Sequence, residues 1–158
     1  MKELRFAPVD TPKGVFLIYF TEAGIYEVAF PGAQPVPGYP RAPLPWPGLA
    51  DDLNQYLSGC SVDWSVYPLD RSGYPPFIAA VLTQVGLIPY GSVITYREAA
   101  ERAGSPLAWR AAGQALKTNR HPIIVPCHRV IGSNGRLGGF SGPAGWKEML
   151  LTLEGVDL

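Results

Sequence analysis

The stretch IIVPCHRVI, residues 123–131, governs how the rest of the chain is interpreted. An apolar, strand-like run leads into Pro126, which fixes a bend, and Cys127, His128 and Arg129 follow at once. Thiolate is the reactive form of cysteine, and neighbouring cationic or basic groups lower a thiol pKa from about 8.5 toward neutrality. The alternative is a buried, inert cysteine, which is a common fate of a free thiol. The cluster around Cys127 favours a nucleophile.

Cys60 has no basic neighbour in Leu57-Ser58-Gly59-Cys60 and fits the buried, inert alternative. The chain has two cysteines and two histidines, with no spacing typical of a zinc site. We therefore expect two free thiols and no metal, with a disulfide between Cys60 and Cys127 as the alternative.

Residues 95–117 have the outline of a helix-turn-helix. Thr95 and Glu98 fit a capping box at the start of one helix, and Gly104 ends it. Ser105-Pro106 then fits the N-cap and first-turn proline of a second helix. Any pair of short helices can have this outline, so the outline alone does not assign a function.

The second helix is predicted to be two-faced. Its inward face is Ala108, Ala111, Ala112 and Ala115, and its outward stripe is Arg110, Gln114 and Lys117. The stripe is either an ordinary solvated helix face or a surface laid against a phosphate backbone, with Gly113 allowing close approach.

The first part of the chain predicts a small sheet. Residues 15–20 and 25–30 are predicted strands joined by a Gly-containing turn, and 62–67 alternates like another strand. Between them, residues 31–47 hold seven prolines and must form a loop, and residues 49–57 form a short helix. Further on, residues 78–85 have helical spacing, and a final helix buries Trp146, Met149, Leu150 and Leu153 before Glu154.

The chain has 158 residues and no net charge, which at first argues against a nucleic-acid partner. The charge is unevenly distributed, however. Residues 1–69 carry 4 basic and 7 acidic side chains, residues 70–158 carry 9 and 6, and no acid lies between Arg102 and Lys147. A one-sided basic surface is typical of nucleic-acid binding. No apolar run is long enough for a membrane span and no signal-peptide core follows Met1, so we expect a cytoplasmic protein without a membrane partner.

The motif PCHRVI, residues 126–131, resembles the active-site signature of the O6-alkylguanine-DNA alkyltransferases, the methylated-DNA–protein-cysteine methyltransferases. The resemblance is close from Pro68 to the C-terminus and holds only in outline before it. Flanking residues agree in order and spacing: PYGSVITY at 89–96, RAAG at 110–113, Asn119, Ser141-Gly142 and LEG at 153–155.

The resemblance implies an α/β fold of the α+β kind. Residues 1–69 would form an N-terminal sheet lobe, ribonuclease-H-like by resemblance and carrying the Pro-rich loop 31–47. Residues 70–158 would form a mainly helical alkyltransferase and DNA-binding domain. The implied activity is single-turnover transfer of an alkyl group from O6-alkylguanine, and from O4-alkylthymine, in double-stranded DNA to Cys127, without a cofactor. The protein would act as a monomer, with its helix-turn-helix in the minor groove.

The resemblance also implies roles for single residues. Glu154 would orient His128, which accepts the thiol proton of Cys127 through a water, and Tyr96 would help guanine leave and rotate out of the helix. Arg110 would fill the vacated place in the stack. The remaining implied residues are Asn119 beside the cysteine, Thr95, Arg97, Trp109, Gly113, Gln114 and Ser133 on DNA, and Val130, Phe140 and Ser141 around the base.

Some positions depart from the family pattern. Trp109 stands where a small residue is usual beside the arginine, Ile78 where a glutamine is usual, Arg120 for a common proline and Phe140 for a frequent tyrosine. The zinc ligands of some members have no counterpart.

Two other classes compete with this interpretation. A Cys-His hydrolase would use the same nucleophile, but adjacent side chains point apart on an extended chain, which disfavours the pair Cys127 and His128. A lesion-binding module resembling the alkyltransferase-like proteins would bind DNA without transfer, but those proteins lack the cysteine.

Overall fold

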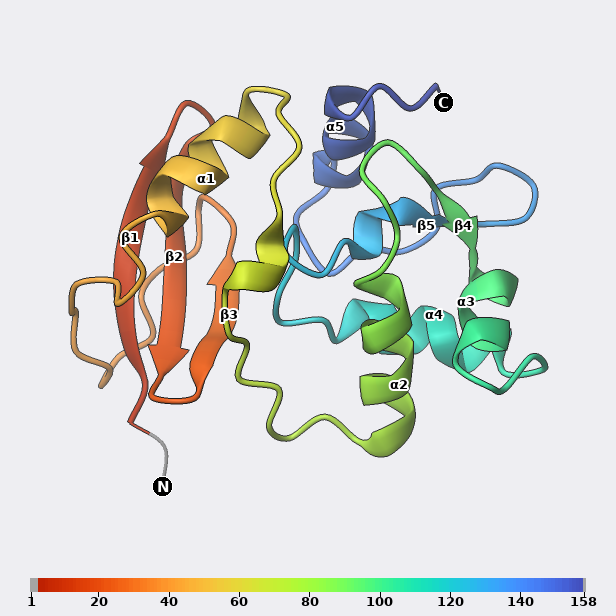
Figure 1. Ribbon diagram of the computed structural model, residues 1–158, viewed down its shortest axis with the longest axis horizontal. Coiled ribbons are helices and arrows are strands. Elements are labelled where there is room, and N and C mark those ends of the chain that lie inside the picture. Colours follow the sequence, from red (N-terminus) through yellow and green to blue (C-terminus); the bar gives the residue numbers. More distant parts are fainter. Residues whose placement is uncertain (1–2, 158) are drawn as a thin grey trace. The chain divides into compact units, whose positions relative to one another are not determined.

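The computed structural model describes residues 3–157, which divide into two compact units, the first ending at Arg71 and the second beginning at Ser72 (Figure 1). The structure combines a small antiparallel sheet with helices, which confirms the mixed α/β class that the sequence predicts. No helix among the described residues is long and apolar enough to cross a membrane.

The first unit is built on a three-stranded antiparallel sheet in the order β1-β2-β3. Its strands are β1 (Arg5–Thr11), β2 (Gly14–Thr21) and β3 (Gly24–Ala29). The central strand β2 is buried from Phe16 onward, so its near-continuous apolar run forms the core rather than one face. Helix α1 (Leu49–Leu57) packs on β1 and buries Leu49, Leu53, Tyr56 and Leu57.

Three features of this unit differ from expectation. Strand β1 was not predicted, because Pro8 and charged residues interrupt its apolar pattern. Residues 62–67 are not a strand: they contain the 3-10 turn η1 (Trp64–Val66), because the Asp63 carboxylate accepts hydrogen bonds from Ser65 N and Oγ at 3.0 and 2.6 Å. The unit reaches Arg71 because Asp70 N donates to Ile25 O at 2.7 Å, beside β3.

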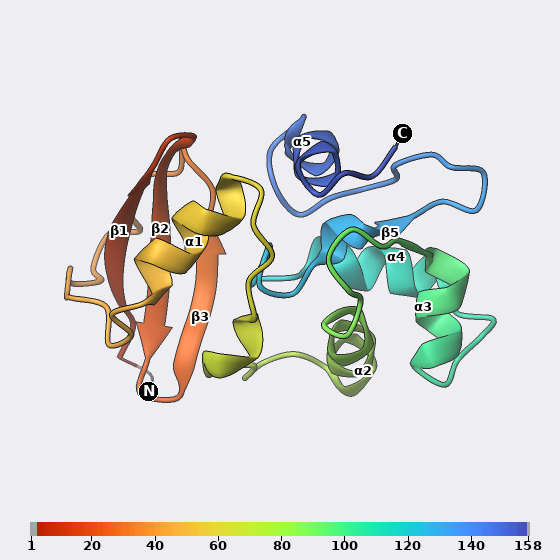
Figure 2. The same cartoon turned by 45° about the horizontal axis from the view of Figure 1, so that its top comes forward.

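The second unit is mainly helical (Figure 2). Helices α2 (Pro76–Val85), α3 (Tyr96–Arg102) and α4 (Trp109–Lys117) pack on one another, and α5 (Trp146–Leu153) ends the unit. A short parallel pair, β4 (Ile94–Thr95) with β5 (Val130–Ile131), joins the start of α3 to the end of the cysteine segment. This pairing fixes the helix-turn-helix relative to Cys127.

The start of α3 is capped as predicted. Thr95 Oγ1 accepts from Glu98 N at 3.1 Å, and the Glu98 carboxylate accepts from Thr95 N, which completes the capping box. Gly104 has φ +84° just past the helix end, a conformation that favours glycine.

The start of α4 was predicted wrongly, and its inward face was predicted correctly only in part. Ser105 does not cap the helix: its carbonyl accepts from Ala108 N at 2.9 Å, which closes a turn, and the helix begins only at Trp109. Ala112 and Ala115 are buried as predicted, whereas Ala111 is exposed and Leu116 completes the buried face. The outward stripe of Arg110, Gln114 and Lys117 is exposed as expected.

Candidate active site

Cys127 lies in a tight turn rather than at the end of a strand. Residues 122–125 form turns, not the predicted strand-like run, and Ile123 has φ +73°, a left-handed conformation that is strained for a β-branched residue. Cys127–Arg129 then form the 3-10 helix η2. Because this helix has three residues per turn, Cys127, His128 and Arg129 point in three different directions around its axis.

Asn119 holds the turn that precedes the cysteine. Its Nδ2 donates to Val125 O at 2.9 Å, and its Oδ1 accepts from His121 N at 2.9 Å, so one amide spans the turn. The same side chain acts to lower the pKa of the Cys127 thiol, an effect that favours the thiolate. Asn119 thus lies beside the cysteine, where the resemblance implied it.

Cys127 is only 2% exposed, and its Sγ lies 3.7 Å from Ser141 Oγ. Burial raises the pKa of the Cys127 thiol, and the opposing effects of Asn119, Ser141 and Lys147 do not offset it. The expectation of a lowered thiol pKa was therefore wrong: the resting group is a thiol, and its proton needs an acceptor. Cys60 also differs from expectation, since it is exposed.

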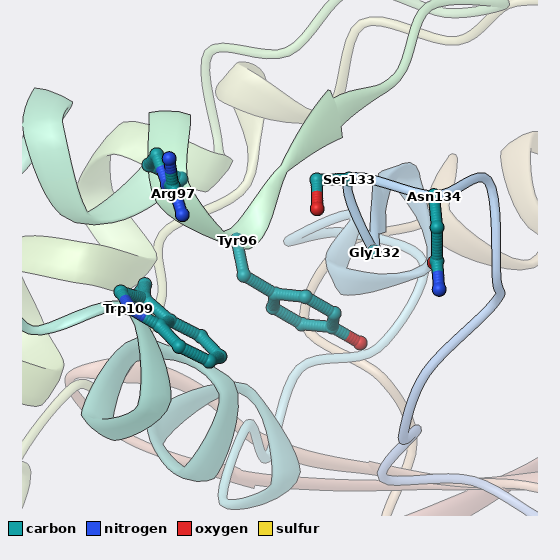
Figure 3. A pocket seen from close by; sticks show the side chains of 6 residues that line it. All are labelled: Tyr96, Arg97, Trp109, Gly132, Ser133 and Asn134. Atoms are coloured by element: carbon teal, nitrogen blue, oxygen red, sulfur yellow. The ribbon is translucent and has the colours of Figure 1, made fainter.

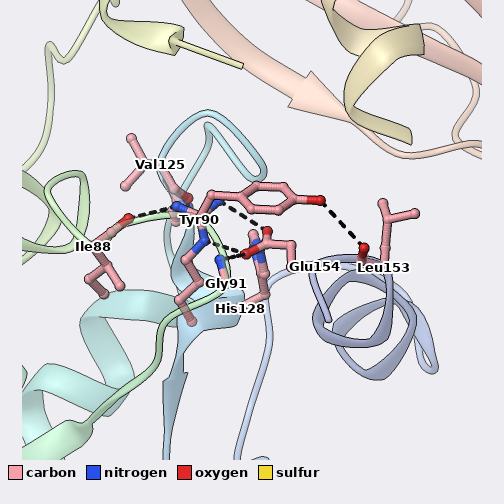
Figure 4. A network of polar contacts seen from close by, with 9 residues as sticks. Ile88, Tyr90, Gly91, Val125, His128, Leu153 and Glu154 are labelled. Carbon is pink, nitrogen blue, oxygen red and sulfur yellow. Dashed lines mark hydrogen bonds and ion pairs between the residues drawn. The ribbon is translucent and has the colours of Figure 1, made fainter. Parts of the chain in front are cut away.

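A buried network of polar contacts joins His128, Arg129 and Glu154, as Figure 4 shows in part. Glu154 is the C-cap of α5, and its carboxylate accepts hydrogen bonds from His128 Nε2 at 2.6 Å and from Gly91 N at 3.0 Å. Arg129 donates to both oxygens of the same carboxylate, from Nε to Oε1 at 2.8 Å and from Nη2 to Oε2 at 3.0 Å. Its Nη1 donates to Ile88 O at 2.6 Å. Glu154 and Arg129 balance each other's charge inside the protein.

His128 is neutral in this setting. Burial lowers the pKa of His128, and the attraction of Glu154 opposes that effect without reversing it. Because Nε2 faces the Glu154 carboxylate, the ring carries its proton on Nε2 and its lone pair on Nδ1. The geometry therefore presents a neutral base one residue from the thiol.

Tyr96 begins α3 and is held at both ends of its ring. The Tyr96 ring lies over Gly113 of α4, where an added Cβ would sit 3.7 Å from the ring. The Tyr96 hydroxyl donates to Leu137 O at 3.3 Å and Gly139 O at 3.5 Å. Gly138, at φ +73°, passes so close to the hydroxyl that a Cβ there would overlap it. Burial raises the pKa of Tyr96, which keeps the hydroxyl protonated and able to donate.

Lys147 is a site residue that the sequence analysis missed. Its side chain is buried, and Nζ donates to Val130 O at 2.6 Å, Gly139 O at 3.2 Å and Tyr96 Oη at 3.4 Å. The buried face of α5 runs through Lys147, Leu150, Leu151 and Glu154, at spacings i, i+3, i+4 and i+7, and not through Trp146, Met149 and Leu153 as expected. The signal that could have found Lys147 is that it lies on the same helix face as Leu150, Leu151 and Glu154, with a charged residue at each end of the face.

The buried ammonium of Lys147 makes stability depend on pH. Burial lowers the pKa of Lys147 from 10.5 to about 8. Between these two values the unfolded chain holds a proton that the folded chain has released, so this group's contribution to the free energy of unfolding rises with pH. We expect Lys147→Met to lose that rise, measured by urea unfolding at pH 7.5 and 9. The control is Lys117→Met, at an exposed lysine; parallel pH profiles for the parent and Lys147→Met would contradict the assignment.

The predicted DNA-contacting residues lie on or next to the helix-turn-helix. Trp109 and Arg97 line a hollow with Tyr96 and Ser133, while Thr95 is half-buried as the N-cap of α3 (Figure 3). Arg110 and Gln114 are exposed on α4, and the Arg110 guanidinium lies 4.9 Å from the Trp109 ring centre. The structure therefore brings one group of these residues into a hollow and leaves the other on the open helix face.

The predicted base-pocket residues occupy different positions. Ser141 contacts Cys127, Phe140 is half-buried, and the Val130 side chain is fully buried while its carbonyl binds Lys147. No cluster of three or more His, Cys, Asp or Glu side chains within residues 3–157 could hold a metal ion.

Comparison with known proteins agrees with this fold. Residues 76–156, half of the chain, match the family model described as 6-O-methylguanine DNA methyltransferase, DNA binding domain. A crystal structure of Mycobacterium tuberculosis OGT in complex with DNA is 33% identical, has a TM-score of 0.83, and aligns over 95% of this chain and 92% of that one.

The methylated-DNA–protein-cysteine methyltransferase of Methanothermobacter thermautotrophicus is 45% identical over 111 residues, which cover 70% of this chain and 61% of that protein. A Mycolicibacterium paratuberculosis protein of the same name is 32% identical over 96% of this chain and 92% of its own length. The chain belongs to the methylated-DNA–protein-cysteine methyltransferase family.

Proposed function

We propose that the chain repairs DNA by direct reversal of alkylation, taking the alkyl group from O6-alkylguanine, and from O4-alkylthymine, onto Cys127. Sγ attacks the alkyl carbon, a carbon–sulfur bond forms, and the bond from carbon to O6 breaks with its electron pair going to the base. Each molecule acts once, because the product is a thioether on the protein. The observation that carries the proposal is the buried pair His128 Nε2 and Glu154 Oε2 at 2.6 Å, next to a buried thiol.

Proton movement follows from the positions of the residues. The thiol proton passes through a water to His128 Nδ1, because Glu154 fixes the ring with its proton on Nε2. Tyr96 donates a proton to the leaving guanine and so neutralises the negative charge that develops on it. The raised pKa of Tyr96 keeps its hydroxyl protonated until that point. Lys147 adds positive charge that favours the Cys127 thiolate during the attack. No cofactor takes part in these steps.

Access to the thiol requires two movements. The damaged nucleotide must leave the DNA stack, because the O6 atom is otherwise inside the duplex, and the exposed Arg110 on α4 would fill the gap that remains. The backbone at residues 137–141 must also shift, because Cys127 is buried and Ser141 lies against it. In this proposal the face of α4 that carries Arg110, Gln114 and Lys117 enters the minor groove, which carries little sequence information and so suits a search for lesions.

A mass-shift experiment tests the proposal. Duplex DNA containing O6-methylguanine should add one methyl group to the Cys127 peptide, at no more than one group per protein molecule, as measured by mass spectrometry of a digest. The same digest reports the Cys60 peptide, which should stay unmodified although its thiol is exposed.

The competing classes give other results in the same experiment. Tight DNA binding with an unmodified Cys127 peptide would indicate a lesion-binding module, and thioester hydrolysis without DNA would indicate a hydrolase. Cys127 and His128 lie in a 3-10 helix and not on an extended chain, but their side chains still point in different directions, which disfavours a direct Cys-His pair as in a hydrolase. The monomeric state and the cytoplasmic location stay predictions, which sedimentation and cell fractionation test.

A further inference from the structure

The turn between α3 and α4 exposes two large apolar side chains. Leu107 is 94% exposed, and Trp109, the first residue of α4, is 40% exposed. An indole offers a wide flat surface and gains most from a planar partner.

Trp109 forms one wall of a hollow of about 230 Å³. The Tyr96 ring and the loop at residues 132–134 form the other walls, with Ser133, Asn134 and Arg97 supplying polar groups (Figure 3). Two aromatic rings with a cation and hydrogen-bonding groups around them suit a nucleobase together with its sugar-phosphate. The surrounding charge also suits DNA, since no acidic residue lies between Arg102 and Lys147.

Arg110 is packed against Trp109 in this structure, with its guanidinium 4.9 Å from the ring centre. If Arg110 enters the DNA stack, it leaves the indole face, which then has no cation over it. Arg110 is not among the residues that line the hollow, so the side of Trp109 that faces Tyr96 is open to a base before Arg110 moves.

We propose that Trp109 is a stacking platform for a nucleobase that loses its neighbour when the damaged nucleotide leaves the helix, and that the hollow between Trp109 and Tyr96 receives this base. The proposal rests on the proposed function, since it concerns DNA that has been opened for transfer to Cys127. Trp109 would hold the opened duplex and thereby make repair depend on stacking as well as on phosphate contacts.

The test uses duplexes that contain O6-methylguanine, with fluorescent 2-aminopurine placed 5′ to the lesion, 3′ to it, or opposite it. Parent protein and Trp109→Phe, which keeps an aromatic ring, should quench 2-aminopurine in one of these positions. Trp109→Ala should lose that quenching and bind the duplex about 10-fold more weakly, the typical loss for one stacked base. Leu107→Ala is the matched control, because it removes an exposed apolar side chain from the same turn, and it should behave as the parent.

Two outcomes would overturn the proposal. One is a Trp109→Ala protein that binds and quenches like the parent. The other is weaker binding with unchanged quenching, which would mean that Trp109 acts only by holding Arg110. Failure of the proposed function has a separate signature: the parent protein would gain no methyl group on Cys127 from any of these duplexes.

Discussion

Cys127→Ala should eliminate alkyl transfer to the protein while DNA binding stays at the parental level. The substitution removes only Sγ, a buried atom that faces Ser141, and leaves the exposed stripe of α4 unchanged. Because the proposed reaction consumes the thiol itself, His128 and Tyr96 have no group to act on without it. The measurement is mass spectrometry after incubation with duplex O6-methylguanine DNA, together with a binding titration on the same duplex.

Cys60→Ala is the matched control, because it removes the other thiol of the chain, which is exposed. It should gain the methyl group at the parental rate. A methyl group found on the Cys127→Ala protein would show that another residue is the acceptor and would refute the assignment of Cys127.

Glu154→Ala should cause the largest loss of stability among the substitutions considered. Glu154 holds His128 at 2.6 Å, Arg129 at 2.8 and 3.0 Å, and Gly91 N at 3.0 Å, all with a carboxylate that has no exposed side-chain surface. Removing it leaves the Arg129 cation buried without its partner, which typically costs about 3–5 kcal/mol. Transfer should also fail, because His128 loses the group that sets its tautomer. Urea unfolding measures the first effect and single-turnover rates the second.

Glu148→Ala provides the control, since Glu148 is an exposed carboxylate on the same helix and should unfold with the parental free energy. If Glu154→Ala does not fold, Glu154→Gln keeps the shape and some hydrogen bonds but removes the charge, and its transfer rate should fall with a shifted pH profile. Parental stability together with a parental rate in Glu154→Ala would contradict the network.

Much of the fold could be predicted because local signals agreed with the final packing. The capping box of Thr95 and Glu98 and the left-handed Gly104 set the limits of α3 without help from the rest of the protein. Where a tertiary or side-chain contact decided the outcome, the sequence misled. Ser105 accepts a turn hydrogen bond instead of capping α4, and Asp63 stabilises a 3-10 turn where the pattern favoured a strand.

The site shows the same division. The motif brought Cys127, His128, Arg129 and Glu154 to attention, but it did not predict that Arg129 binds Glu154, and Lys147 was missed altogether. Arg129 contacts Glu154 across 25 residues of sequence and Lys147 reaches Tyr96 across 51, so neither partnership leaves a local pattern. The thiol pKa was predicted in the wrong direction because adjacent basic residues in sequence say nothing about burial, which dominates at Cys127.

Gly138 limits which amino-acid substitutions the segment before α5 can accept. Any side chain at this position would need an unfavourable φ of +73° and would also push aside the Tyr96 hydroxyl. A single replacement in this loop would therefore displace a proton donor of the site. Gly135 has a similar φ, +79°, but faces open space, so a replacement there meets backbone strain alone. Two glycines three residues apart therefore differ in mutational tolerance, and sequence diversity among active variants should accumulate around Gly135 and avoid Gly138.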